Sequence, residues 1–161
     1  MIEDLISQDH ERIINSYFQY KLTKSQNEAE ESFNNVIKDI CKLFIAEEVT
    51  LFPLINKIPE LEGKLVKELI EEHDEIKNIL NELYNNSTCQ FFNETFEILM
   101  EDIMNHFLRE EKELYPVIKQ HISKTLENEI YDLFNKRNNI IEKDLRCMLT
   151  NKSQDYNSYF T

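Results

Sequence analysis

The chain has 161 residues, with one glycine, three prolines and a net charge of −13 from 31 acidic and 18 basic side chains. This length fits a single domain with a sizeable core, and the scarcity of turn-forming residues argues against β architecture and for long helices. The acidic balance argues against nucleic acid and anionic membranes as partners, because both require a basic surface.

Apolar residues spaced by three and four positions predict amphipathic helices along most of the chain. The predicted ranges are about 3–22, 29–52, 60–84, 91–115 and 124–148. Pro53 should end or kink the second helix, Pro59 suits the first turn of the third, and Ser123 is placed to N-cap the fifth. We expect loops at 23–28 and 85–89.

The second and fourth helices contain related segments. KLFIAEEVTLFP at 42–53 aligns with NHFLREEKELYP at 105–116, and a single offset of 63 residues gives nine identities in the 23 positions from 33 to 55. Leu43 faces His106 in this alignment. Each half of the chain is therefore expected to form the same helical hairpin. Two hairpins make an all-α, up-down-up-down four-helix bundle, to which the C-terminal fifth helix is added.

These elements predict the organisation of the whole chain. We expect one helical-bundle domain over 1–149, with its core at 3–120, followed by a flexible tail at 150–161. The N-terminal sequence MIEDLISQDH is too acidic for a signal peptide, and no stretch approaches the roughly 20 apolar residues of a membrane span. The cysteines are scattered without a CxxC motif, which is typical of reduced thiols. We therefore expect a cytoplasmic protein.

Three histidines and two acids occupy matched positions in the repeat. His10 aligns with His73, Glu47 aligns with Glu110, and Glu110 follows His106 by four residues on the same helix face. Counting about 1.5 Å of rise per residue from the hairpin turns places the histidine and the acid at corresponding heights in both hairpins. We expect His10, Glu47, His73, His106 and Glu110 to converge in one layer of the bundle.

Imidazole and carboxylate groups on core-facing positions require a physical reason. A buried charge costs several kcal/mol unless it is paired or bound to a metal. Imidazole together with carboxylate suits iron, manganese or zinc, and two bridging carboxylates suit a dinuclear pair. The sequence therefore predicts a metal site inside the bundle.

Other polar residues near these positions have simpler expected roles. Glu48 and Glu111 are rotated by about 100° from the ligand face, so we expect them to be solvated or paired with lysine. Asp39 lies one turn before Leu43, where it either replaces the missing histidine or acts through a water molecule. His121 is expected at the surface.

The motifs QDHERI, EEVTLFP, EEHDEI and HFLREEKELYP resemble the hemerythrin-like family, which is the HHE cation-binding domain. The likeness covers roughly residues 5–120. It implies a non-haem iron site in a four-helix bundle, usually with two irons. His10, His73 and His106 match the terminal ligands of this family, and Glu47 and Glu110 match its bridging carboxylates.

The chain departs from the family pattern at Leu43, where relatives usually have a histidine. The resemblance therefore implies either two irons with one ligand missing or a single iron. The expected role is binding or sensing O₂, NO, another small oxidant or redox state. The alternatives are repair of iron–sulfur clusters or iron handling, and a metal-free helical interaction module with a vestigial site. A protein partner or an oligomer is compatible with each alternative.

Overall fold

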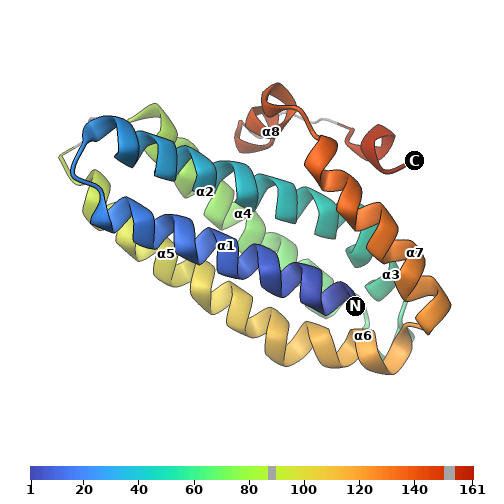
Figure 1. Ribbon diagram of the computed structural model, residues 1–161. Coiled ribbons are helices and arrows are strands. Elements are labelled where there is room, and N and C mark those ends of the chain that lie inside the picture. The colour runs from blue at the N-terminus through green and yellow to red at the C-terminus, as the bar shows by residue number, and fades with distance from the viewer. Residues whose placement is uncertain (87–89, 151–154) are drawn as a thin grey trace.

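The fold is known from a computed structural model, which describes residues 1–86, 90–150 and 155–161. Four long helices form an antiparallel bundle (Figure 1). They are α1 at Ile2–Leu22, α2 at Gln26–Ala46, α4 at Lys64–Asn85 and α5 at Phe92–Arg109. Helix α1 packs along α2, and α4 packs along α5. The described residues contain no strand, so the predicted all-α bundle of two hairpins is confirmed.

The apolar stripes of these helices meet in one continuous core. Its members include the repeat-related pairs Phe33 with Phe96 and Phe44 with Phe107, all of which are buried. The first hairpin has a tighter turn than predicted because the Ser25 side chain accepts a hydrogen bond from the backbone N–H of Glu28 and N-caps α2.

Both helices that carry the Glu-Glu pair widen into a π-helical turn at that pair. The turns are Glu47–Leu51 and Glu110–Leu114, which continue as α3 at Phe52–Ile55 and α6 at Tyr115–His121. In each turn, the N–H preceding the proline donates to the carbonyl five residues back, that of Glu47 or Glu110. Pro53 and Pro116 lack an N–H and crowd the preceding turn, which explains the widening. The prolines therefore kink these helices without ending them, so both helices run past their predicted ends.

The connection between the hairpins also differs from the prediction. A short 3₁₀ turn at Pro59–Leu61 is followed by Glu62 and Gly63, which have φ angles of 52° and 70°. This left-handed pair breaks the helix that was expected to begin at residue 60, and α4 therefore begins at Lys64.

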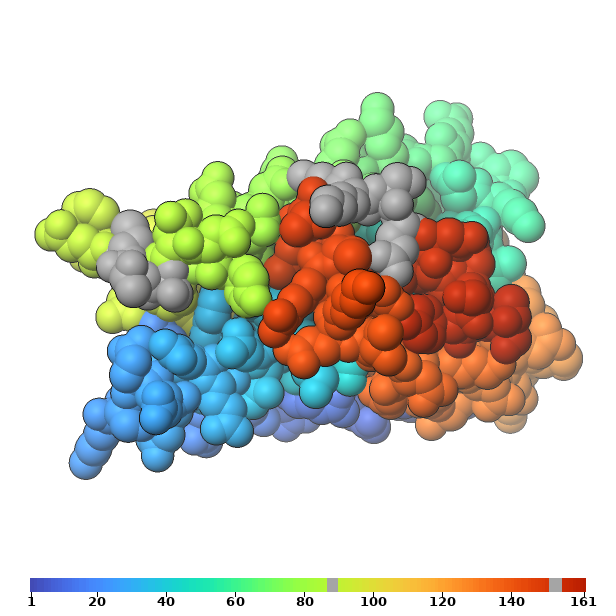
Figure 2. All heavy atoms as spheres, turned by 90° about the horizontal axis from the view of Figure 1, so that it is seen from above, coloured from blue at the N-terminus to red at the C-terminus, as the bar shows by residue number. Residues whose placement is uncertain are grey.

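The predicted fifth helix is divided into three parts. They are α7 at Lys124–Asn135, a 3₁₀ turn at Lys136–Asn139 and α8 at Glu142–Leu149. Ser123 N-caps α7 as predicted, because its side chain accepts from the N–H of Leu126. The extended residues Ile140 and Ile141 turn the chain back, so that α8 packs on α2 and α4 (Figure 2). A straight helix would have carried the apolar side chains of α8 away from the bundle.

The C-terminal residues 155–161 also differ from the free tail that was expected over 150–161. Phe160 is buried, the Tyr156 hydroxyl donates to the carbonyl of Asp144 at 2.8 Å, and Lys136 donates to the carbonyl of Thr161 at 2.9 Å. The rest of that expectation concerns 151–154, which lie outside the described residues. No helix in the described part of the chain is long and apolar enough to cross a membrane.

Replacing Gly63 with alanine should lower the free energy of unfolding by roughly 1 kcal/mol, because a β-carbon disfavours the left-handed conformation. An ideal Cβ there would also lie 3.0 Å from Oδ1 of Asn56. Urea denaturation followed by circular dichroism measures the change. Lys64→Ala, one position later at an exposed helical site, is the matched control. Equal stability of the two variants would contradict this account of the turn.

Candidate metal centre

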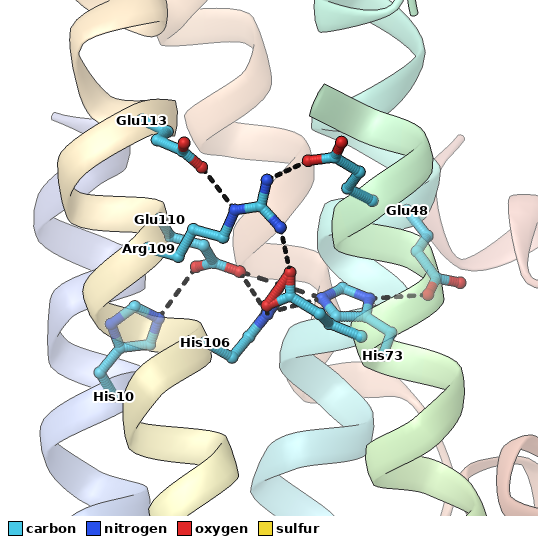
Figure 3. Close-up of polar contacts among 9 residues, drawn as sticks. His10, Glu48, His73, His106, Arg109, Glu110 and Glu113 are labelled. Carbon is cyan, nitrogen blue, oxygen red and sulfur yellow. Dashed lines mark hydrogen bonds and ion pairs between the residues drawn. The ribbon is translucent and has the colours of Figure 1, made fainter. Parts of the chain in front are cut away.

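All five residues predicted to form the site are buried. Figure 3 shows the three histidines with the Glu110 carboxylate between them. His10 lies on α1, His73 on α4 and His106 on α5, while Glu47 and Glu110 each begin one of the π-helical turns. The widened turns therefore occur where the two acids enter the core.

Three of these residues form a compact group of potential ligands. The Nε2 atoms of His73 and His106 lie 3.1 Å apart, and His106 Nε2 lies 2.7 Å from Oε1 of Glu110. One donor atom from each residue lies within 4.8 Å of the others. Two nitrogens and one carboxylate oxygen converging in a buried volume are suited to a borderline transition-metal ion.

The second carboxylate oxygen of Glu110 faces the other half of the bundle. Its Oε2 atom lies 3.1 Å from Nε2 of His10, while Oε1 faces His73 and His106. The carboxylate therefore stands between the histidine pair of one half and the single histidine of the other. This is the arrangement expected of a carboxylate that can serve two neighbouring positions.

The Glu47 carboxyl group is the least satisfied part of the cluster, in which Nδ1 of His10 and Oε1 of Glu110 also lack a hydrogen-bond partner. Both oxygens of Glu47 are buried without a hydrogen-bond partner. Burial and the nearby negative charge of Glu110 raise the pKa of the Glu47 carboxyl well above its usual range. A buried carboxylate without a donor is costly, whereas coordination to a cation would satisfy it. The donor set therefore fits a metal ion.

The charge of Glu110 is compensated by the histidines around it. Burial alone would raise the pKa of the Glu110 carboxyl, but the positive charge of His106 and hydrogen bonds from the facing histidines hold it well below its usual range. For His106, burial acts in the opposite direction and lowers the pKa. The Glu110 and Glu72 carboxylates outweigh this effect and raise the pKa of His106 to about 9. In the metal-free protein, Glu110 is ionised and His106 carries a proton at neutral pH.

A second ring of carboxylates, which sequence reasoning missed, faces the outer nitrogens of the histidines. The Nδ1 atom of His73 lies 2.8 Å from Glu48, that of His106 lies 3.2 Å from Glu72, and that of His10 lies 4.0 Å from Glu111. Glu48 and Glu72 lie within hydrogen-bond distance and orient the rings of His73 and His106 so that their Nε2 atoms face the centre, whereas Glu111 is too far from His10 for a hydrogen bond.

The expectation that Glu48 and Glu111 would be solvated or lysine-paired is therefore incomplete. Glu48 does lie 3.9 Å from Lys77, but it also contacts His73. The repeat in the sequence offered a signal for this role. Glu48 and Glu111 occupy equivalent positions in it, and so do the histidines that they face, His73 and His10. A helical wheel treats one helix alone and does not reveal what a neighbouring helix brings to that position.

Aromatic rings cover the histidines on their apolar faces. Phe107 stacks on His10 and Phe44 stacks on His73, each with ring centroids 3.7 Å apart. The two phenylalanines are repeat mates, so both hairpins shield a histidine in the same way. This packing keeps water away from the donor atoms and strengthens electrostatic interactions among them.

Leu43 is fully buried in α2 and brings no donor atom to the cluster. Asp39 is only partly buried, and its main charged neighbours are Arg12, Lys42, Asp9 and Lys38. Asp39 is also absent from the metal-type group found among the described residues. The alternative in which Asp39 replaces the missing histidine therefore has no support from these contacts. His121 is exposed at the end of α6, as expected.

The fold and the site define a class of protein: an antiparallel helical bundle with a buried histidine and carboxylate cluster of metal-binding type. The comparisons with known proteins agree with this class. The model of the hemerythrin HHE cation binding domain matches residues 1–118. The chain therefore belongs to the hemerythrin HHE cation-binding family.

One curated relative is a DNA nickase from Nostoc sp. (strain PCC 7120 / SAG 25.82 / UTEX 2576), which is 26% identical over 123 residues. The aligned part is 76% of this chain but 34% of that protein, so the chain spans about a third of the length of this relative. No solved structure matches the chain significantly.

Metal-free protein should lose stability as the pH rises from about 6.5 to about 9. A histidine whose pKa is raised on folding stabilises the folded state below its unfolded pKa, here 6.5, and this contribution is lost as the pH passes the folded value of about 9. The loss should be about 2–3 kcal/mol, measured by urea denaturation in chelator at the two pH values. His106→Gln is the control and should show a smaller pH dependence. Equal pH dependence in both proteins would contradict the assignment.

Proposed function

We propose that the chain is a hemerythrin-like non-haem iron protein that binds or senses O₂, NO or the redox state of its surroundings. Iron would be held by His73, His106 and Glu110, with His10 and Glu47 on the second side of the Glu110 carboxylate. The observation that carries the proposal is the buried group of two Nε2 atoms and a carboxylate oxygen, all within 4.8 Å of one another. Iron bound there would supply one-electron redox chemistry and could bind a small molecule.

The residues of the chain prepare the site for such an ion. Glu48 and Glu72 accept hydrogen bonds from the Nδ1–H groups of His73 and His106, which leaves Nε2 as the atom available for coordination. The charge of Glu72 also helps to raise the pKa of His106. Phe44 stacks on His73 and excludes water from that side. The site is therefore suited to a small neutral ligand.

Protein purified without chelator after growth with iron should retain iron, measured by elemental mass spectrometry. His73→Ala and Glu110→Ala should each lower the iron content at least tenfold, because each removes one of the three converging donors. His121→Ala removes an exposed histidine and should retain the iron of the unaltered chain. Near-full iron retention in the two site variants would contradict the metal assignment. So would less than about 0.2 iron per chain in the unaltered protein, which would favour the metal-free interaction module.

The proposed sensing role has its own test. Adding O₂ or NO to the reduced, iron-loaded protein should change its visible absorption spectrum, because the ligand would enter an open iron position. The spectrum should not change in His73→Ala protein treated in the same way. An iron-loaded protein whose spectrum responds to neither gas nor to a chemical oxidant would retain the metal site but not the sensing role.

We propose no nucleic-acid role from the DNA nickase relative. The likeness covers about a third of that protein, whose activity belongs to the whole chain. The net charge of −13 opposes binding to a phosphate backbone.

A further inference from the structure

The second-ring acid Glu72 has two partners, which define its role in the half of the site that contains His73 and His106. Its Oε1 atom lies 3.2 Å from Nδ1 of His106, and its Oε2 atom accepts a hydrogen bond from Arg109 at 2.5 Å. Arg109 also bonds Glu68 and Glu113. One acid therefore orients the histidine, and an arginine secures that acid.

The 63-residue repeat assigns a counterpart to each of these positions in the first half. Glu72 corresponds to Asp9, and His106 corresponds to Leu43. Asp9 is thus the acid that would have oriented a histidine at position 43. The acid is retained and is 2% exposed, although the leucine that replaces the histidine has no N–H to donate to it.

Arg137 takes the place of that missing donor. Its Nε atom donates to Oδ2 of Asp9 at 2.7 Å, and its Nη2 atom donates to Oδ1 at 2.8 Å, in a two-bond ion pair. Arg12 adds a longer contact of 3.2 Å to Oδ1. Both carboxylate oxygens of Asp9 therefore already face guanidinium groups.

The Arg137 guanidinium is buried and held in position by its own segment. It is 3% exposed, donates to the carbonyl of Phe134 at 3.2 Å and lies 4.8 Å from the centre of the Phe134 ring. The 3₁₀ turn that carries Arg137 packs against α2, the helix of Leu43. Arg137 also lies beyond residue 118, where the match to the family ends.

We propose that Arg137 limits the site to one metal ion by occupying Asp9, which directly precedes His10 in α1, and by placing a fixed positive charge there. This proposal rests on the proposed metal-binding function. A second ion in the half of the site that contains His10 and Glu47 would need an imidazole at position 43 and an acid to orient it. Arg137 already pairs with the orienting acid, Asp9, and its positive charge repels a further cation. The leucine at position 43 and the pairing of Asp9 with Arg137 are therefore linked features of this half of the site.

The proposal predicts that restoring the histidine alone will not restore the second ion. Leu43→His protein should bind one iron per chain, like the unaltered protein. Leu43→His combined with Arg137→Gln should bind two, because Asp9 then becomes free to accept from the new Nδ1–H and the buried cation is removed. Leu43→His combined with Arg137→Lys is the matched control and should remain at one. Iron and protein are quantified by elemental mass spectrometry and amino-acid analysis, and folding is checked by circular dichroism.

The outcomes separate this proposal from the metal assignment itself. Two irons in Leu43→His alone would overturn the role of Arg137, and this result does not depend on the folding of any double variant. One iron in the folded Gln double variant would overturn it too. If that variant does not fold, Arg137→Met in the same background provides the second measurement, because methionine fills the space of the arginine stem without an unsatisfied amide. Absence of iron from the unaltered chain would instead contradict the proposed function.

Discussion

The Glu110 carboxylate is the group on which the rest of the site depends. It is fully buried, where an isolated charge would cost several kcal/mol, and it is balanced by imidazoles from three helices. One oxygen faces His73 and His106, and the other faces His10. Because these partners come from α4, α5 and α1, one carboxylate ties together the two hairpins of the bundle. The π-helical turn that begins at Glu110 marks where the backbone accommodates this position.

The two halves of the bundle share a scaffold but have different chemistry. Each half has a histidine stacked on a phenylalanine, an acid at the start of a π-helical turn and a second acid facing the outer nitrogen of a histidine. The second half keeps its full complement through His106 and Glu72. The first half has an apolar side chain at Leu43, and its corresponding acid, Asp9, pairs with Arg137. The two halves of the repeat therefore differ: one offers converging donor atoms, and the other has a buried leucine and an acid that is already paired with an arginine.

Much of this architecture could be predicted from the sequence because it follows from local periodicity and from the repeat. The helical hairpins, the convergence of the two acids and three histidines, and the aromatic packing all derive from spacing along the chain. The repeat singled out Glu48 and Glu111, but the contacts between the second-ring acids and the histidines could not be derived in that way. Glu72 reaches His106 from a neighbouring helix, and the Asp9–Arg137 pair joins residues 128 positions apart, which no local pattern relates. The break within the predicted fifth helix has the same origin, because burial of Ile140 and of the α8 side chains against α2 and α4 outweighs continuous helix formation.

The central proposal is that a single metal ion binds at the position defined by His73, His106 and Glu110. A crystal structure of the iron-loaded protein, with anomalous diffraction collected on both sides of the iron absorption edge, tests it most directly. The account predicts one strong anomalous peak bonded to Nε2 of both histidines and to a Glu110 oxygen, and no comparable peak beside His10 and Leu43. A peak located only outside the bundle core, or two equal peaks flanking the Glu110 carboxylate, would contradict it.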